Sequence, residues 1–167
     1  MAKTILNNFL KIVIIIIVYL LQIYVINNSL LFGINGNLCL VLVILFTLLS
    51  GVTEAYIYSF LCGILSDVLF LNTFGKYTLI YIIVTSVLIG FKKIYKQESK
   101  YAIIIFIVSG IAISEVLMYV FYLFSSGTAI NIFSLILLIL KESIINVCLA
   151  FILYVICKNV FRYKRGN

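Results

Sequence analysis

The fold is decided by two apolar runs, IVIIIIV at residues 12–18 and IFSLILLIL at residues 132–140. Neither run alternates apolar with polar residues, as the strands of a membrane barrel do. In lipid the backbone has to satisfy its own hydrogen bonds, so runs rich in isoleucine and valine become helices despite their modest helix propensity in water. The two runs therefore predict transmembrane helices.

The rest of the chain has the same character. Of its 167 residues, 65% are hydrophobic and 10% are charged, and the mean hydropathy is +1.30. A soluble domain carries about 25% charged residues and could not hide so much apolar surface. The composition predicts an all-α integral membrane protein with a single transmembrane domain over residues 1–167.

Six segments are candidate spans, at about residues 12–26, 37–50, 54–71, 77–91, 101–124 and 131–157. The apolar part of the second, residues 38–49, is shorter than the roughly 20 residues that cross a bilayer, so a re-entrant segment is the alternative to a span there. Basic residues cluster before the first segment, between the fourth and fifth, and after the sixth.

Basic clusters favour the cytoplasmic side, and all three fall there only if the second segment crosses. We therefore expect a single compact bundle of six transmembrane helices with both termini cytoplasmic. In that arrangement every Lys and Arg residue is cytoplasmic except Lys76, in an outer turn, and Lys141, within the sixth span.

Several function classes are disfavoured by what the chain contains. It has no histidine, which is the commonest general base and metal ligand, and its four cysteines show no C-x-x-C spacing. We therefore expect no catalytic site, cofactor or metal. The net charge of +7 comes from residues beside apolar runs, so it reports membrane topology and not nucleic-acid binding.

Small residues recur every four positions in the third segment, at Gly51, Ala55, Ser59 and Gly63. Such a stripe follows an i±4 ridge and lets another helix approach closely. One interpretation is packing inside the bundle. The other is a docking surface for a partner's transmembrane helix.

Ionisable residues inside spans are costly and normally find partners. At 1.5 Å per residue, Glu115 and Lys141 lie at similar depths, about 14 and 16 Å from the outer ends of their helices. We expect them to form an ion pair that fixes the last two spans, with proton or ion coupling as the alternative. Glu142 shares a helix face with Asn146 and could bond within the helix or across to a neighbour. We expect Glu54 to be solvated at the inner membrane surface.

One segment carries a more specific pattern, GILSDVLFLNTFG at residues 63–75, which has the form G-x3-D-x7-G through Gly63, Asp67 and Gly75. Gly63 permits close packing, Asp67 can cap the turn or accept bonds from its amides, and Gly75 allows a positive φ. This segment resembles the most recognisable part of the MreD family. The length, the short loops, the basic loop and the basic tail are also similar to that family.

The resemblance implies a non-enzymatic scaffold subunit of the rod-shape, or cell-wall elongation, complex in the bacterial cytoplasmic (plasma) membrane. Its partners there would be a bitopic MreC-like protein, the actin-like MreB and the cell-wall synthases that make peptidoglycan. The MreD family also resembles in fold the substrate-binding S components of energy-coupling-factor vitamin importers. An S-component-like importer subunit is therefore the alternative function.

Overall fold

In the computed structural model, the described residues, 2–27, 37–70, 75–92, 100–126 and 131–162, form six α-helices and no strand. The helices are α1 (Ala2–Asn27), α2 (Leu38–Leu49), α3 (Val52–Phe70), α4 (Lys76–Lys92), α5 (Lys100–Ser126) and α6 (Ile132–Arg162). They coincide with the six expected segments, and α1 and α6 extend beyond them. Of the expected basic clusters, residues 93–99 and the tail residues Lys164 and Arg165 lie outside the described residues.

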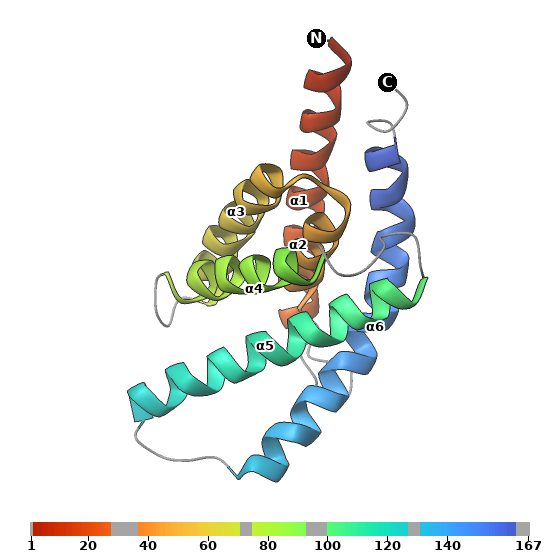
Figure 1. The fold of residues 1–167 in the computed structure, drawn as a ribbon. Helices are drawn as coiled ribbons and strands as arrows, with labels where there is room; N and C mark the ends of the chain where they lie inside the picture. Colours follow the sequence, from red (N-terminus) through yellow and green to blue (C-terminus); the bar gives the residue numbers. More distant parts are fainter. Residues whose placement is uncertain (1, 28–36, 71–74, 93–99, 127–130, 163–167) are drawn as a thin grey trace.

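The centre of the molecule is α2, a short helix enclosed by the others (Figure 1). All eleven residues from Leu38 to Leu48 are buried. A helix that is apolar on every face needs to be covered on every face, and α1, α3, α4, α5 and α6 all contact it. The segment whose role was least certain from its length is thus the core around which the bundle forms.

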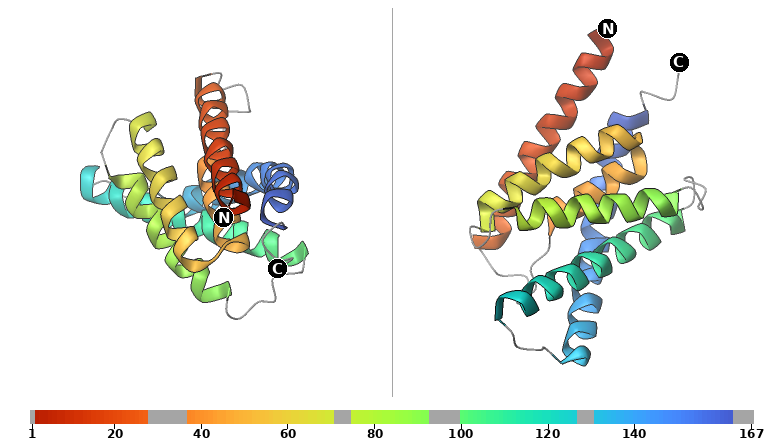
Figure 2. Two further views of the ribbon diagram at one scale, coloured as in Figure 1. Left: turned by 90° about the horizontal axis from the view of Figure 1, so that it is seen from above. Right: turned by 60° about the vertical axis from the view of Figure 1, so that its left-hand side comes forward.

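α1 and α6 run lengthwise through the molecule, whereas α4 and α5 run across it (Figure 1). The start of α1 and the end of α6 lie toward the same end (Figures 1 and 2). The helices with the most extensive contact are α3 and α4, which are consecutive in the chain and form a helical hairpin. The hairpin and α5 are strongly inclined to α1 and α6 (Figure 2).

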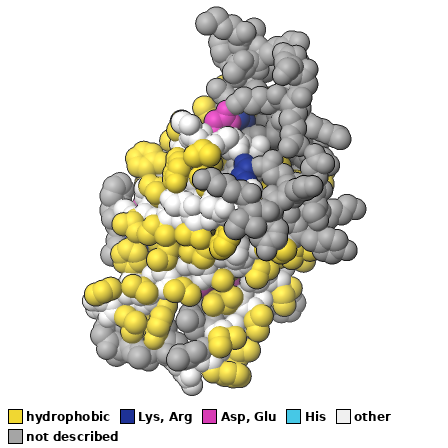
Figure 3. Space-filling model, in the orientation of Figure 1, with side chains coloured by type: hydrophobic (Ala, Val, Ile, Leu, Met, Phe, Trp, Pro, Cys, Tyr) yellow, Lys and Arg dark blue, Asp and Glu magenta, His cyan; other side chains and the backbone are white. Residues whose placement is uncertain are grey.

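Within the described residues, three helical segments are long and apolar enough to cross a membrane: Val52–Phe70, Ile103–Ser125 and Ile139–Cys157. Phe9–Tyr24, which is part of α1, and Leu38–Leu49, which is α2, are shorter apolar helical segments. Hydrophobic side chains are spread over the surface in Figure 3, and large apolar residues are exposed on α1, α3, α4, α5 and α6. Soluble proteins rarely expose apolar surface so widely, so the molecule has the surface of a membrane protein.

Candidate functional site

Asp67 of α3 binds the start of α4 and is 2% exposed. Its Oδ1 accepts the N–H of Tyr77 at 2.7 Å, and its Oδ2 accepts the N–H of Thr78 at 3.2 Å and the Thr78 hydroxyl at 2.5 Å. The first N–H groups of a helix have no partner within it, and a negative charge there also interacts favourably with the helix dipole. Asp67 therefore caps α4 from the neighbouring helix, as the sequence predicted.

The two glycines of the motif complete this junction. A Cβ on Gly63 would overlap the Cα of Thr78 and lie 3.0 Å from its Oγ1, so only glycine lets α3 come this close to α4. Gly75 has a φ of 92°, in the left-handed region that favours glycine. Gly63, Asp67 and Gly75 thus act together in one place, with the roles expected from their residue types.

The small-residue stripe lies mostly inside the bundle. Ala55 is 1% exposed and Ser59 is fully buried, while Gly63 packs on Thr78. Gly51 precedes α3, is exposed, and has no atom within 4 Å of the position that its Cβ would take. Packing within the bundle is therefore the interpretation that the structure favours, and the expectation of a stripe that docks a partner is corrected. The reason is that α2 and α4 occupy that face of α3.

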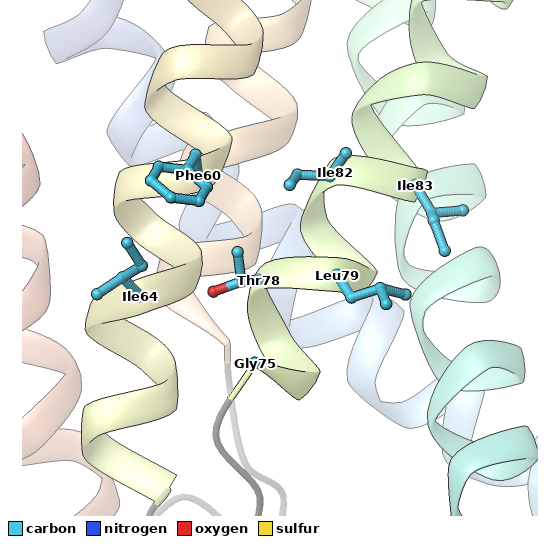
Figure 4. Close-up of a pocket in the computed structure, with 7 residues that line it drawn as sticks. All are labelled: Phe60, Ile64, Gly75, Thr78, Leu79, Ile82 and Ile83. Carbon is cyan, nitrogen blue, oxygen red and sulfur yellow. The ribbon is translucent and has the colours of Figure 1, made fainter.

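An apolar groove opens beside the stripe, between α3 and α4 (Figure 4). Phe60 and Leu79 at its walls are 49% and 47% exposed. Its lining is almost wholly hydrocarbon, and its residues are Phe60, Ile64, Gly75, Thr78, Leu79, Ile82 and Ile83. Two of them, Gly75 and Thr78, lie at the start of α4, where Asp67 binds. The Asp67 contacts therefore hold together the two helices that form the walls of the groove.

Lys141 does not pair with Glu115 as the sequence predicts. Lys141 is exposed, and among the described residues no ion pair joins it to Glu115. The expected Glu115–Lys141 ion pair is therefore wrong. Adjacent positions on a helix differ by about 100° of rotation, so a similar depth does not bring two side chains to facing sides of their helices.

A polar network surrounds the start of α2, and sequence reasoning missed most of it. The Asn37 Oδ1 caps α2 by accepting the Leu40 N–H at 2.9 Å, and it also accepts the Tyr81 hydroxyl at 3.0 Å. The Asn146 Oδ1 accepts the Asn37 N–H at 3.0 Å, so Asn146 bonds across to another helix and not to Glu142. The available signal was the amide side chains within or beside apolar spans, at Gln22, Asn37 and Asn146.

The same network continues to α1 and α3. The Gln22 Oε1 accepts the Leu38 N–H at 2.6 Å, and the Ser66 Oγ donates to the Tyr81 hydroxyl at 3.2 Å. Gln22 and Ser66 are both almost fully buried. Gln22 of α1 and Asn146 of α6 thus accept amides at the start of α2, while Tyr81 of α4 and Ser66 of α3 extend the network from the Asn37 side chain.

The opposite end of the bundle holds a buried ion pair. The Lys11 Nζ lies 2.8 Å from the Glu54 Oε2 and 5.4 Å from the centre of the Tyr58 ring, and the Lys11 side chain is fully buried. The Lys92 Nζ donates to the carbonyls of Thr47 and Ser50 at the end of α2, at 2.9 and 2.6 Å. The expectation that Glu54 is solvated at the inner membrane surface is therefore wrong, because Lys11 of α1 forms an ion pair with it.

The residues that could hold a metal are few. Within the described part of the chain, no three His, Cys, Asp or Glu side chains come together in a metal-binding group. The four cysteines are free thiols, with Cys39, Cys62 and Cys157 buried and Cys148 exposed.

Fold and site together define a helical protein with a membrane-type surface, a central buried helix and a capped helical hairpin. Comparisons with family models, with curated proteins and with solved structures found no match.

Proposed function

We propose that the chain is a non-enzymatic scaffold subunit of an MreD-like kind, which binds a partner's transmembrane helix in the bacterial plasma membrane. The observation that carries the proposal is the apolar groove between α3 and α4, built on the turn where the MreD-like motif lies. Its partners would be an MreC-like bitopic protein in the groove, and the actin-like MreB and cell-wall synthases within the same complex.

The chemistry of the groove suits another helix. Lipid tails are as apolar as leucine, so helices associate in membranes through close van der Waals fit and not through hydrophobic burial. A groove with fixed walls offers that fit, whereas a flat apolar face does not. The Asp67 cap and the Gly63 contact hold α3 and α4 at a set separation, so the shape of the groove is preorganised.

The proposal includes six spans with both termini cytoplasmic. The buried Lys11 and the half-buried Lys92 lie toward the end of the bundle where α1 begins and α6 ends, which agrees with a cytoplasmic location for that end. Reporter fusions at residue 35 and after residue 167 should then report opposite sides of the membrane. Fusions that report the same side would contradict the six-span topology.

Partner binding is tested by filling the groove. Leu79→Trp adds bulk at a wall that is already half exposed, so the bundle keeps its packing while a seated helix is displaced. Overfilling a packed contact costs about 1–3 kcal/mol, so recovery of an MreC-like partner should fall roughly tenfold and the cells should become round. The matched control is Ile152→Trp, on α6, where the side chain is 63% exposed.

The readouts are membrane abundance, partner recovery after detergent extraction, and cell shape. We expect both variants to be present at the wild-type level, with only Leu79→Trp losing the partner. Equal partner recovery by the two variants would remove the groove from the mechanism.

A further inference from the structure

Lys141 is an exposed cation within an apolar helix. It lies in the candidate span Ile139–Cys157, and the apolar run IFSLILLIL at residues 132–140 precedes it. The start of α6 is therefore about 14 Å away along the helix, or about two and a half turns. A lysine at a helix end reaches the membrane surface with its flexible stem, but this one lies too far along α6 to do so.

A charge in this position is costly in lipid and normally has a partner. In the part of the chain that the structure describes, Lys141 forms no ion pair and no hydrogen bond. The bundle therefore leaves its charge without a partner, which points to a group outside this chain.

Lys141 lies at the centre of the outward face of α6. One turn before it Leu137 is 40% exposed, and one turn after it Ile144 is 67% exposed, whereas Ser143 and Ala150 on the opposite face are buried. A spacing of three and four residues along one face suits a second helix that crosses at a shallow angle. The exposed residues of α6 at this spacing are Leu137, Lys141, Ile144, Cys148, Phe151 and Val155.

The partner group has to be an anion at the depth of Lys141. Lipid tails carry no charge, and phosphates of lipid headgroups lie at the membrane surface, outside the apolar run that precedes Lys141. A second copy of this chain is disfavoured, because two copies that meet through α6 about a twofold axis bring their Lys141 side chains to the same level, where like charges repel. An acidic residue in another protein's transmembrane helix meets the requirement, since it too needs a partner in lipid.

We infer that the outward face of α6 around Lys141 binds a transmembrane helix of another protein that carries Asp or Glu at the same depth. The exposed apolar residues on either side fit many helices, so the ion pair selects the partner and fixes its register. This surface is on a different helix from the groove between α3 and α4. Leu79→Trp, which fills that groove, should leave binding at α6 intact, so the failure of one proposal is distinguishable from the failure of the other.

The test is photo-cross-linking in the membranes of the cells that make the protein. A benzophenone amino acid replaces Ile144, one turn from Lys141, and in a matched control it replaces Ile17 on α1, which is 51% exposed. We expect a discrete cross-linked protein from position 144 and no product of that mass from position 17. At equal membrane abundance, Lys141→Met should lower the yield roughly tenfold, whereas Lys141→Arg should retain it.

Mass spectrometry of the cross-linked peptide then identifies the partner's segment. It should be a transmembrane helix with an acidic residue within about one turn of the linked position. Changing that residue to lysine should abolish the cross-link, and combining the change with Lys141→Glu should restore it. The inference is overturned if position 144 yields no protein, if it links only lipid or a second copy of this chain, if the linked segment has no acidic residue, or if Lys141→Met keeps the full yield.

Discussion

Replacing Asp67 by alanine should destabilise the protein because it removes the cap at the start of α4. The side chain is 2% exposed and accepts three hydrogen bonds, from the Tyr77 N–H and from the N–H and hydroxyl of Thr78. Bonds to a charged group contribute about 1.5–3 kcal/mol each, but contributions of neighbouring bonds are not additive, so we expect a loss of about 3–5 kcal/mol. Asp67→Asn keeps one carbonyl oxygen as a cap and should lose about 1–2 kcal/mol.

The free energy of unfolding is measured by sodium dodecyl sulfate titration in mixed micelles, followed by circular dichroism. Thr78→Val removes one donor and should cost about 1 kcal/mol in the wild type but little in the Asp67→Ala background, because its partner is already gone. Thr53→Val, at an exposed threonine on α3, is the control. A loss below about 1 kcal/mol for Asp67→Ala, or equal losses for alanine and asparagine, would refute the capping argument.

Two further predictions concern packing and charge. Gly63→Ala should lower the free energy of unfolding by about 2–4 kcal/mol because its methyl group would overlap the Thr78 backbone, whereas Gly90→Ala, where the added group meets nothing within 4 Å, should be neutral or slightly stabilising in the same titration. Lys11→Met and Glu54→Gln should each destabilise the protein, and a double-mutant cycle should give a coupling of about 1–3 kcal/mol; a coupling near zero would mean that the 2.8 Å contact contributes nothing.

The helices of this fold could be predicted from sequence because each segment is set by local apolar length. Polar residues mark where the helices end, and the observed bounds of α2 to α5 lie close to the expected segments, whereas α1 and α6 extend beyond theirs. The motif was also predictable, since Gly63, Asp67 and Gly75 have roles that follow from residue type and from a short separation in the chain. The inclination of the hairpin and α5, and the enclosure of α2, could not be predicted in this way. They depend on how the surfaces of all six helices pack against one another.

The pairing of charges could not be predicted because depth in the membrane does not give rotation about the helix axis. Glu115 and Lys141 were matched by depth, yet Lys141 is exposed in the structure. The same limitation hid the contact of Lys11 with Glu54, in which the two residues are 43 positions apart. To predict either contact, one must know how each helix is rotated about its own axis relative to the other. The sequence of one segment does not give that rotation.

The two faces of α4 serve different parts of the molecule, and this restricts how α4 variants are interpreted. Thr78, Leu79 and Ile82 line the groove, while Tyr81 turns inward and bonds Asn37 and Ser66 at the start of α2. A change at Tyr81 therefore disturbs the central helix and the Asn37 position next to Asn146, and its effect on a partner would be indirect. A change at Leu79 alters a half-exposed wall and leaves those buried bonds in place. Only substitutions on the groove face can separate loss of partner binding from loss of the interior that supports it.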